Sequence, residues 1–337
     1  MPNISSYTFP QMTDLVNRSF QDWLQSLPQV MRTSGLVVEE AMPQHTGEFK
    51  RFAERIQRNQ YASVRDEGDI SKMAKVQYGY EKDMQVYTVS LEVSITKRMR
   101  VAGKNQEILD QITSLAEVCP ATMDLDLTHR LSFAFDNSYV SRDGITIDTT
   151  VGDGLSLINA AHTLTGSSTT YSNKISGNPA FSKAALENAE KLFVEETYNN
   201  LGEKMVMKPD VIVTTDDPNT INQVRELLKA TADISTSNSG TFNVYANKYR
   251  HVVLPRLATS ATGAVDTAKR KYWFLASSND SDFYLSILEA PYVKTPSNWN
   301  NGEEFSSENW KYLTAATYGM AIVTGRWIKG SKGDASL

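Results

Sequence analysis

Hydrophobic and polar residues alternate with a period of two over residues 87–96, which indicates a β-strand with one buried face. A shorter run of the same kind covers residues 76–80, and the polar segment 81–84 separates the two. The pattern therefore predicts a long β-hairpin with its turn at 81–84. Two strands alone are barely stable in water, so this hairpin needs a further layer from the same chain or from another.

Apolar residues recur at helical spacing over residues 104–135 and predict a long helix. They are Ile108, Ile112, Leu115, Cys119, Met123, Leu127 and Leu131. Pro120 is expected to kink this helix or divide it in two, because proline lacks the backbone N–H and its ring clashes with the preceding turn.

A second helix is expected to begin after Ser182, which has the side chain of an N-cap. Phe181 and Leu186 flank it as a hydrophobic staple, and Gly202 is expected to end the helix.

The segment from residue 209 onward has an α/β pattern. Residues 209–215 predict a short apolar strand, Asp217 caps the next helix, and Pro218 takes its first position. The buried stripe of that helix is predicted to be Ile221, Val224, Leu227 and Leu228. Further strands are expected within 250–255, 271–277, 283–293 and 318–327.

The first 65 residues contain no pattern of a complete core. One helical face carries Met12, Leu15, Val16, Trp23, Leu24 and Leu27, and Pro28 interrupts it. Two interpretations stay open: the helix packs on its own domain, or it forms a surface for a partner.

Composition narrows the class of protein. The chain has 337 residues, of which 40% are hydrophobic and 22% charged, as in soluble globular proteins. The net charge of −5 argues against a surface built throughout for nucleic acid, although a local basic patch stays possible. The single cysteine, Cys119, excludes an internal disulfide and a cysteine-based zinc cluster. The sequence has no signal-peptide pattern and no apolar run long enough for a membrane span, so a soluble protein made inside a cell is expected.

Candidate chemistry is sparse. The four histidines are His45, His129, His162 and His251, and no two have a metal-ligand spacing. Neither a nucleophile elbow nor a phosphate-binding glycine loop occurs, so no metal or cofactor is expected.

One segment, residues 153–173, gathers the components of a hydrolytic triad. It contains Asp153 and His162, followed by the hydroxyls of Ser167, Ser168 and Ser172. A triad is defined in space, so the sequence leaves it possible. We favour a structural loop in which His162 and the hydroxyls bind local backbone groups.

The C-terminal stretch 326–333 is basic, with Arg326, Lys329 and Lys332. Contact with phosphate and a solvated terminus explain these cations equally well.

Four stretches, taken in order, resemble a known family. They are "LTHRLSFAFDNSYVSRDG", "DGLSLINAAHTLTGSSTTYSN", "MKPDVIVTTDDPNTINQVRELLKA" and "YGMAIVTGRWIKGSKG". From about residue 60 onward the chain resembles the major capsid protein of tailed phages, with its Hong Kong-97-type fold, and in particular the Mu-like major head subunits. The order of the stretches carries the resemblance, since no single motif is diagnostic.

The resemblance implies an α+β fold with five parts. They are an N-terminal arm (1–65), an extended E-loop hairpin (66–100), a peripheral domain with a spine helix (101–207), an axial domain (208–310), and a returning strand with the C-terminal tail (311–337).

The resemblance also implies a structural protein and no enzyme. Hexamers and pentamers would form an icosahedral virion shell, assembled in the cytoplasm of the bacterial host, with double-stranded DNA enclosed by non-specific proximity. Portal and decoration proteins would be separate. The arm begins almost at Met1, so a scaffold would be a separate protein or absent. No membrane partner is implied.

The contacts between subunits that the resemblance implies fall on the arm and the hairpin. They are Trp23, Arg65, Asp66, Glu67, Lys75, Lys82 and Asp83. Asp153, His162 and Asn173 would hold the structural loop. Lys72, Lys75 and Lys82 lie in the hairpin, but we predict no lysine–asparagine crosslink. Two alternatives stay open: an encapsulin-like compartment shell, and a hydrolase that uses His162.

Overall fold

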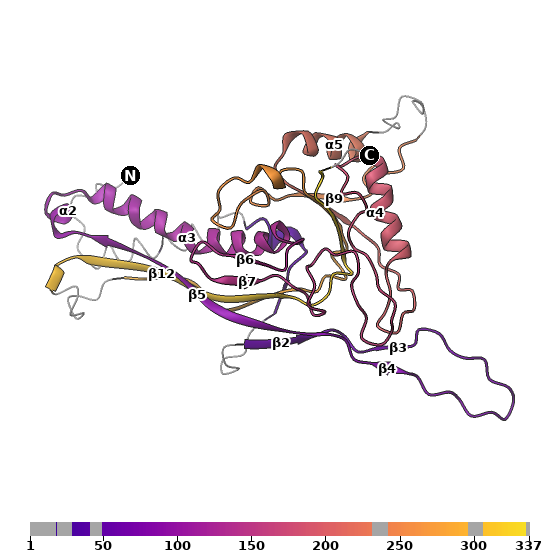
Figure 1. The fold of residues 1–337 in the computed structure, drawn as a ribbon. Helices are drawn as coiled ribbons and strands as arrows, with labels where there is room; N and C mark the ends of the chain where they lie inside the picture. The colour runs from indigo at the N-terminus through magenta and orange to yellow at the C-terminus, as the bar shows by residue number, and fades with distance from the viewer. Residues whose placement is uncertain (1–17, 19–28, 41–48, 231–241, 296–305, 335–337) are drawn as a thin grey trace.

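The strand predicted at residues 87–96 lies inside a five-stranded sheet. The computed structural model describes residues 18, 29–40, 49–230, 242–295 and 306–334 (Figure 1). The strands in order across this sheet are β1 (Val38–Glu39), β11 (Phe283–Lys294), β12 (Trp310–Ile322), β5 (Glu81–Ile95) and β2 (Phe49–Ala53). β1 pairs with β11 in parallel, and the other neighbours are antiparallel.

The predicted hairpin is wrong. Residues 81–84, interpreted as its turn, are the first part of β5, which pairs with β2 and β12. Met84 is 1% exposed and packs with Phe52 and Val323. The physical reason is that β2 and β12 offer β5 a buried apolar contact and a full ladder of backbone partners, which residues 76–80 do not.

Residues 76–80 belong to a different feature, a projecting loop. β4 (Val76–Gln77) pairs with β3 (Gln57–Arg58), and the chain between them runs away from the rest of the molecule (Figure 1). We call residues 59–75 the projecting loop.

The predicted long helix is one element, α3 (Asn105–Ser132), preceded by the short α2 (Lys97–Val101). α3 is not divided at Pro120. Its apolar residues, including Leu115 and Met123, are buried in two clusters with side chains of the sheet. This packing outweighs the backbone hydrogen bond that the proline removes.

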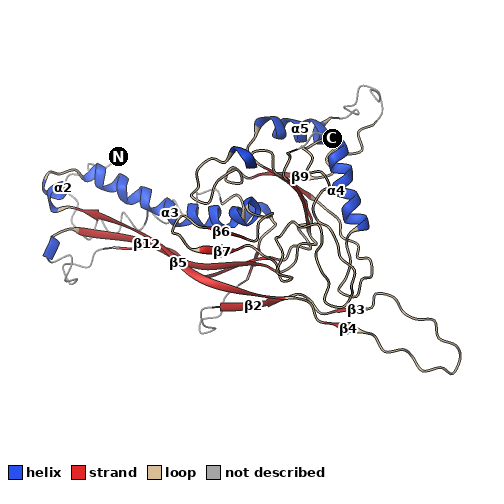
Figure 2. Ribbon diagram, in the orientation of Figure 1, coloured by secondary structure: helices blue, strands red, loops and turns tan. Residues whose placement is uncertain are grey.

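A second sheet has the order β13 (Ile328–Ser331), β10 (Trp273–Ala276), β8 (Val211–Thr214) and β9 (Arg250–Val253). β8 and β9 are parallel, and the other pairs are antiparallel. The helices α4 (Lys183–Glu195) and α5 (Pro218–Lys229) lie beside this second sheet, away from the long strands of the first sheet (Figure 2).

Both predicted helix caps are confirmed. The Ser182 hydroxyl accepts a hydrogen bond from Ala185 N, and the Asp217 carboxylate accepts one from Thr220 N. The predicted end of the first of these helices at Gly202 is wrong, because α4 ends at Glu195. Beyond it the chain forms a separate turn, which Gly202 closes with a φ of 82°.

Smaller elements complete the described chain. β6 (Ser138–Val140) and β7 (Thr146–Asp148) form a hairpin, and two 3₁₀ helices span Arg32–Ser34 and Thr267–Lys269. The main apolar core joins α3 to both sheets and contains Tyr318 and Trp327, both with no exposed area. Among the described residues, no helix has the length and apolar character that crossing a membrane requires.

Candidate interaction surface

The segment 153–173 brings its aspartate and histidine together in a buried position. His162 Nδ1 lies 2.7 Å from Asp153 Oδ2, and the two side chains are 0% and 3% exposed. His162 Nε2, which in a triad would face the nucleophile, lies 3.3 Å from the carbonyl oxygen of Leu157. Asn173 Nδ2 donates to the same carbonyl oxygen at 2.6 Å and to that of Gly325 at 2.9 Å.

The candidate serines do not complete a triad. The Ser167 hydroxyl donates to Thr169 Oγ1, the Ser172 hydroxyl donates to the carbonyl of Lys174, and Ser168 is exposed. The contacts of the histidine and asparagine support the structural-loop interpretation.

The environment of the Asp153 carboxyl keeps it ionised. Burial favours the neutral form, but hydrogen bonds from the His162 ring and from the backbone N–H groups of Leu155 and Thr163 together hold the pKa of Asp153 below its usual value.

We expect His162→Ala to lower the free energy of unfolding by about 2–3 kcal/mol, because it leaves a buried carboxylate without its main partner. Chemical denaturation measures the loss. The matched control is His251→Ala, whose ring binds the neutral hydroxyl of Thr214 at 2.8 Å. An equal or smaller loss for His162→Ala than for the control would contradict the structural role.

The basic stretch 326–333 is largely buried, which contradicts both interpretations made from sequence. Arg326 and Lys329 lie in the interior with 3% and 0% exposure, so they neither contact phosphate nor form a solvated terminus. Lys329 belongs to β13. The backbone of residues 173–175 forms hydrogen bonds with the backbone of the neighbouring Gly330 along the edge of this strand. The Lys329 ammonium faces two carbonyl oxygens, those of Ser172 at 3.4 Å and Glu196 at 3.3 Å.

Lys329 makes the stability of the fold depend on pH. Burial lowers its pKa to about 7, with Arg326 adding to the effect and Glu196 opposing it. The unfolded chain holds this proton up to a pH near the ordinary value of 10.5. Between these limits the unfolded state binds more protons, so Lys329 makes stability rise with pH by up to about 1.4 kcal/mol per unit. Below pH 7 the cost of the buried charge is present in full.

We therefore expect Lys329→Met to be more stable than the native chain at pH 6 and to lose this advantage progressively toward pH 10. Denaturant titrations at pH 6, 8 and 10 measure the difference. The control is Lys332→Met, at a half-buried position directly after the end of β13. It should show no such trend. A gain that is the same at every pH would contradict the buried-charge explanation.

A buried polar network holds the base of the projecting loop. The Glu54 carboxylate forms a salt bridge with Arg326, and it also accepts hydrogen bonds from Asn200 Nδ2 at 2.9 Å and Gln57 Nε2 at 3.0 Å. Arg326 Nη2 donates to Asn200 Oδ1 at 2.5 Å, and Asn200 N donates to Gln57 Oε1 at 2.6 Å. We call these four residues the base network.

Further contacts tie both strands of the loop to the body. Glu203 accepts hydrogen bonds from Gln60 N at 2.8 Å and Asn59 Nδ2 at 3.0 Å, and these lower its pKa. On the other strand, the Tyr78 carbonyl accepts a hydrogen bond from Thr165 Oγ1 at 2.7 Å. Tyr80 Oη lies 2.7 Å from Thr163 Oγ1.

Close backbone approach at this base requires glycine. A Cβ at Gly79 would lie 2.3 Å from Glu54 Oε2, and one at Gly166 would lie 2.7 Å from the carbonyl oxygen of Asn200. A larger residue at either position would displace the contacts at the base of the loop.

Beyond this base the projecting loop exposes large apolar side chains. Val64, Ile70 and Met73 are 95%, 93% and 97% exposed, and Tyr61 is 70% exposed. Isolated exposed apolar residues are ordinary, but these stand on one narrow extension that has no core of its own. The loop therefore has the character of a surface that is buried by a partner.

The residues predicted to contact other subunits divide into three groups. Arg65, Asp66, Glu67 and Lys75 are exposed on the projecting loop. Lys82 and Asp83 lie instead in β5, where they pair within the chain. Lys82 Nζ lies 2.6 Å from Asp148 Oδ2, and Asp83 accepts two hydrogen bonds from Arg51, at 2.7 and 2.9 Å. Trp23 is outside the described residues.

The sequence interpretation missed the apolar residues of the loop and the whole base network. The apolar residues of the loop could have been noticed in residues 61–76. There, single apolar side chains stand among charged residues and follow neither the period of a strand nor that of a helix. The network gave no local signal, because Glu54 and Arg326 are 272 positions apart.

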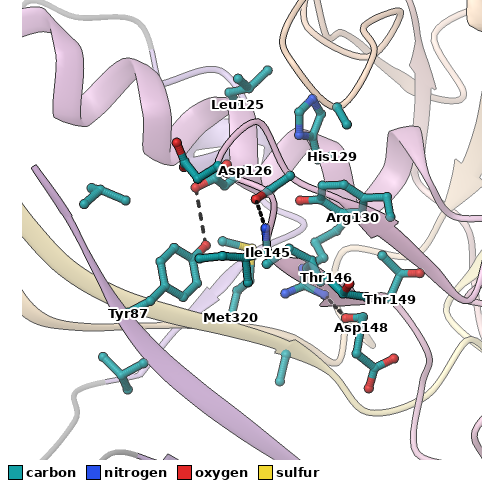
Figure 3. A pocket seen from close by; sticks show the side chains of 18 of the residues that line it. Tyr87, Leu125, Asp126, His129, Arg130, Ile145, Thr146, Asp148, Thr149 and Met320 are labelled. Atoms are coloured by element: carbon teal, nitrogen blue, oxygen red, sulfur yellow. Dashed lines mark hydrogen bonds between the residues drawn. The ribbon is translucent and has the colours of Figure 1, made fainter.

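A cavity of about 460 Å³ lies between β5, α3 and the β6–β7 hairpin (Figure 3). The Tyr87 and Tyr318 hydroxyls lie 3.3 and 2.6 Å from Asp126 Oδ2. Burial raises the pKa of Asp126, and it lowers the pKa of His129 to about 4 with help from the Lys269 charge.

The two titratable groups of this cavity named above, Asp126 and His129, already have partners in the chain. His129 Nε2 lies 3.1 Å from Thr259 Oγ1, and the Asp126 carboxylate is bonded to two tyrosines. Within the part of the chain that the structure describes, no three His, Cys, Asp or Glu residues are grouped to hold a metal ion. The cavity is therefore a weaker candidate than the projecting loop.

No protein-family model and no curated protein matches the sequence. Solved structures do match the fold. A chain of the capsid of the cyanophage P-SCSP1u is 9% identical, with a TM-score of 0.53, and the match covers 88% of this chain and 85% of that one. A chain from Gordonia phage Cozz is 10% identical, with a TM-score of 0.51 and coverages of 90% and 85%. A chain of the capsid of Myoviridae phage XM1 is 13% identical, with a TM-score of 0.50 and coverages of 90% and 91%.

These matches extend over nearly the whole of each chain, so they concern the complete arrangement of helices and strands. The predicted α+β fold is confirmed, and it resembles the fold of chains from phage capsids.

Proposed function

We propose that the chain is the major capsid protein of a tailed bacteriophage and that its copies assemble into the icosahedral head shell around double-stranded DNA. The observation that carries the proposal is the match in fold, over most of both chains, to chains of two phage capsids. The exposed apolar side chains of the projecting loop support it independently, because a shell protein buries such surface against its neighbours.

The parts of the fold receive roles under this proposal. The projecting loop takes the role of the E-loop, with bounds of 59–75 in place of the hairpin predicted at 66–100. The five-stranded sheet with α3 corresponds to the peripheral domain and its spine helix. The second sheet with α5 takes the role of the axial domain. Of the bounds predicted for that domain, 208–310, β13 lies outside, and β11 lies inside but belongs to the five-stranded sheet. Residues 1–58 keep the role of the arm, because the predicted end of the arm at 65 falls within the projecting loop.

Assembly supplies the burial that the single chain lacks. Hexamers and pentamers would cover the loop, so the apparent stability of the chain would rise with the extent of assembly. Scaffolding, portal and decoration proteins would be separate chains, and assembly would take place in the host cytoplasm.

The test is the state of association of the purified chain, alone and together with any scaffolding protein found in the same genome. Sedimentation velocity and negative-stain electron microscopy should show rings or closed particles. A chain that stays monomeric under every assembly condition would contradict the proposal. Particles that enclose a protein cargo in place of DNA would indicate a compartment shell.

A further inference from the structure

The end of the molecule opposite the projecting loop carries a basic segment. Residues 97–104, which include α2, contain the four cations Lys97, Arg98, Arg100 and Lys104 and no acidic residue. Lys97 pairs with Glu308 and Lys104 pairs with Glu107. The Arg98 side chain is exposed, and it has no hydrogen bond or ion pair within the part of the chain that the structure describes.

Apolar surface lies directly beside these cations. Val101 is 80% exposed, and a shallow depression is lined by Lys97, Arg98, Val101 and Ala102. A surface of this kind accepts a partner that combines carboxylates with apolar side chains.

The tip of the projecting loop has the complementary composition. A turn at residues 66–69, with Gly68 at a φ of 89°, presents the carboxylates of Asp66, Glu67 and Asp69 to solvent. Val64 and Ile70 flank the turn and are each more than 90% exposed. We call residues 64–70 the acidic turn, since its three carboxylates outnumber its one cation, Arg65.

The two surfaces cannot meet within one molecule, because α2 and the projecting loop lie at opposite ends of the fold (Figure 1). A second copy can bring them together. Such a contact is heterologous, since each copy contributes a different surface, and repeated contacts close into a ring when the rotation between copies permits.

We propose that the acidic turn of one copy docks on the α2 surface, residues 97–104, of the next copy. The proposal rests on the proposed function and names the surface that receives the loop. Val64 and Ile70 are buried against Val101, and the opposite charges orient the contact. Exposed ion pairs contribute little individually, so apolar burial supplies most of the affinity and charge supplies register and rate of association.

Disulfide trapping tests the contact directly. Chains that carry Glu67→Cys together with Arg98→Cys are assembled and oxidised, and non-reducing electrophoresis should show a ladder of linked copies. The control chain carries Glu67→Cys with Lys229→Cys, which is exposed at the end of α5. Both chains keep the native Cys119, which is buried.

Particles without a ladder, or an equal ladder in the control, would overturn the proposed contact and leave the capsid function standing. Failure of both chains and of the native chain to form any ring or particle would contradict both.

Charge exchange gives a second and independent readout. Asp66→Lys with Glu67→Lys should reduce particle yield at least tenfold at low salt, as should Lys97→Glu with Arg98→Glu. A chain that carries all four changes should recover most of the yield, because the opposite charges face each other again. No recovery would count against the contact. If the α2 variant assembles normally but its particles hold less DNA, the basic surface binds nucleic acid and the proposal is wrong.

Discussion

Replacing Arg326 with methionine is expected to lower the free energy of unfolding by about 3–5 kcal/mol, because it leaves the buried Glu54 carboxylate without its counter-charge. The side chains of Arg326 and Glu54 are 3% and 4% exposed, so water cannot take over the lost interaction. The change also removes the hydrogen bond that Arg326 donates to Asn200 Oδ1, so a second member of the base network loses a partner.

The double replacement Arg326→Met with Glu54→Met is the matched control. A buried pair that is exchanged as a whole for apolar side chains costs far less than a pair that loses one member, so the double variant should recover much of the stability. Denaturant titration at neutral pH measures both. A loss below about 1 kcal/mol in the single variant, or an equal loss in the double variant, would show that the pair does not hold the base of the loop.

The largest effect on association is expected from the tip of the projecting loop. Changing Val64, Ile70 and Met73 together to serine should abolish particle formation at concentrations where the native chain assembles. Each apolar side chain contributes about 1.5–3 kcal/mol when it is buried, so the triple change weakens every contact by several kcal/mol. The stability of the single chain should stay within about 0.5 kcal/mol, because all three side chains are exposed before assembly.

The control triple changes Val206, Val244 and Val265 to serine. These valines are 82%, 72% and 76% exposed and lie outside the projecting loop. Light scattering during assembly compares the two triples with the native chain. Equal inhibition by both would mean that the loop has no special part in association, and unchanged assembly of the loop variant would contradict the role given to the loop.

The features that the sequence predicted correctly are local ones. The caps at Ser182 and Asp217 could be predicted because each side chain accepts a hydrogen bond from a backbone N–H only three residues later. A few neighbouring residues are therefore enough to identify them. The apolar alternation around Val89 likewise identifies β5 without knowledge of its partners. The family resemblance rested on the order of such elements, which the fold preserves at sequence identities near 10%.

The features that the sequence concealed depend on distant partners. The charges of Arg326 and Lys329 suggested a solvated surface, because a cation is rarely buried without carboxylate or carbonyl acceptors. Here those acceptors belong to residues 54, 172 and 196, which are distant in the sequence. The hairpin was predicted wrongly for a related reason. Residues 81–84 have the polar composition of a turn, but their backbone pairs with residues 50–53, which lie 28 to 34 positions earlier in the chain.

The central claim, that the chain is a shell protein whose projecting loop binds a neighbouring copy, is tested most directly by cryo-electron microscopy of the assembled protein. The account predicts closed particles built from five- and six-membered rings, in which residues 59–75 of each copy lie against the next copy. A chain that never forms particles, or particles in which this loop touches only its own chain, would contradict it.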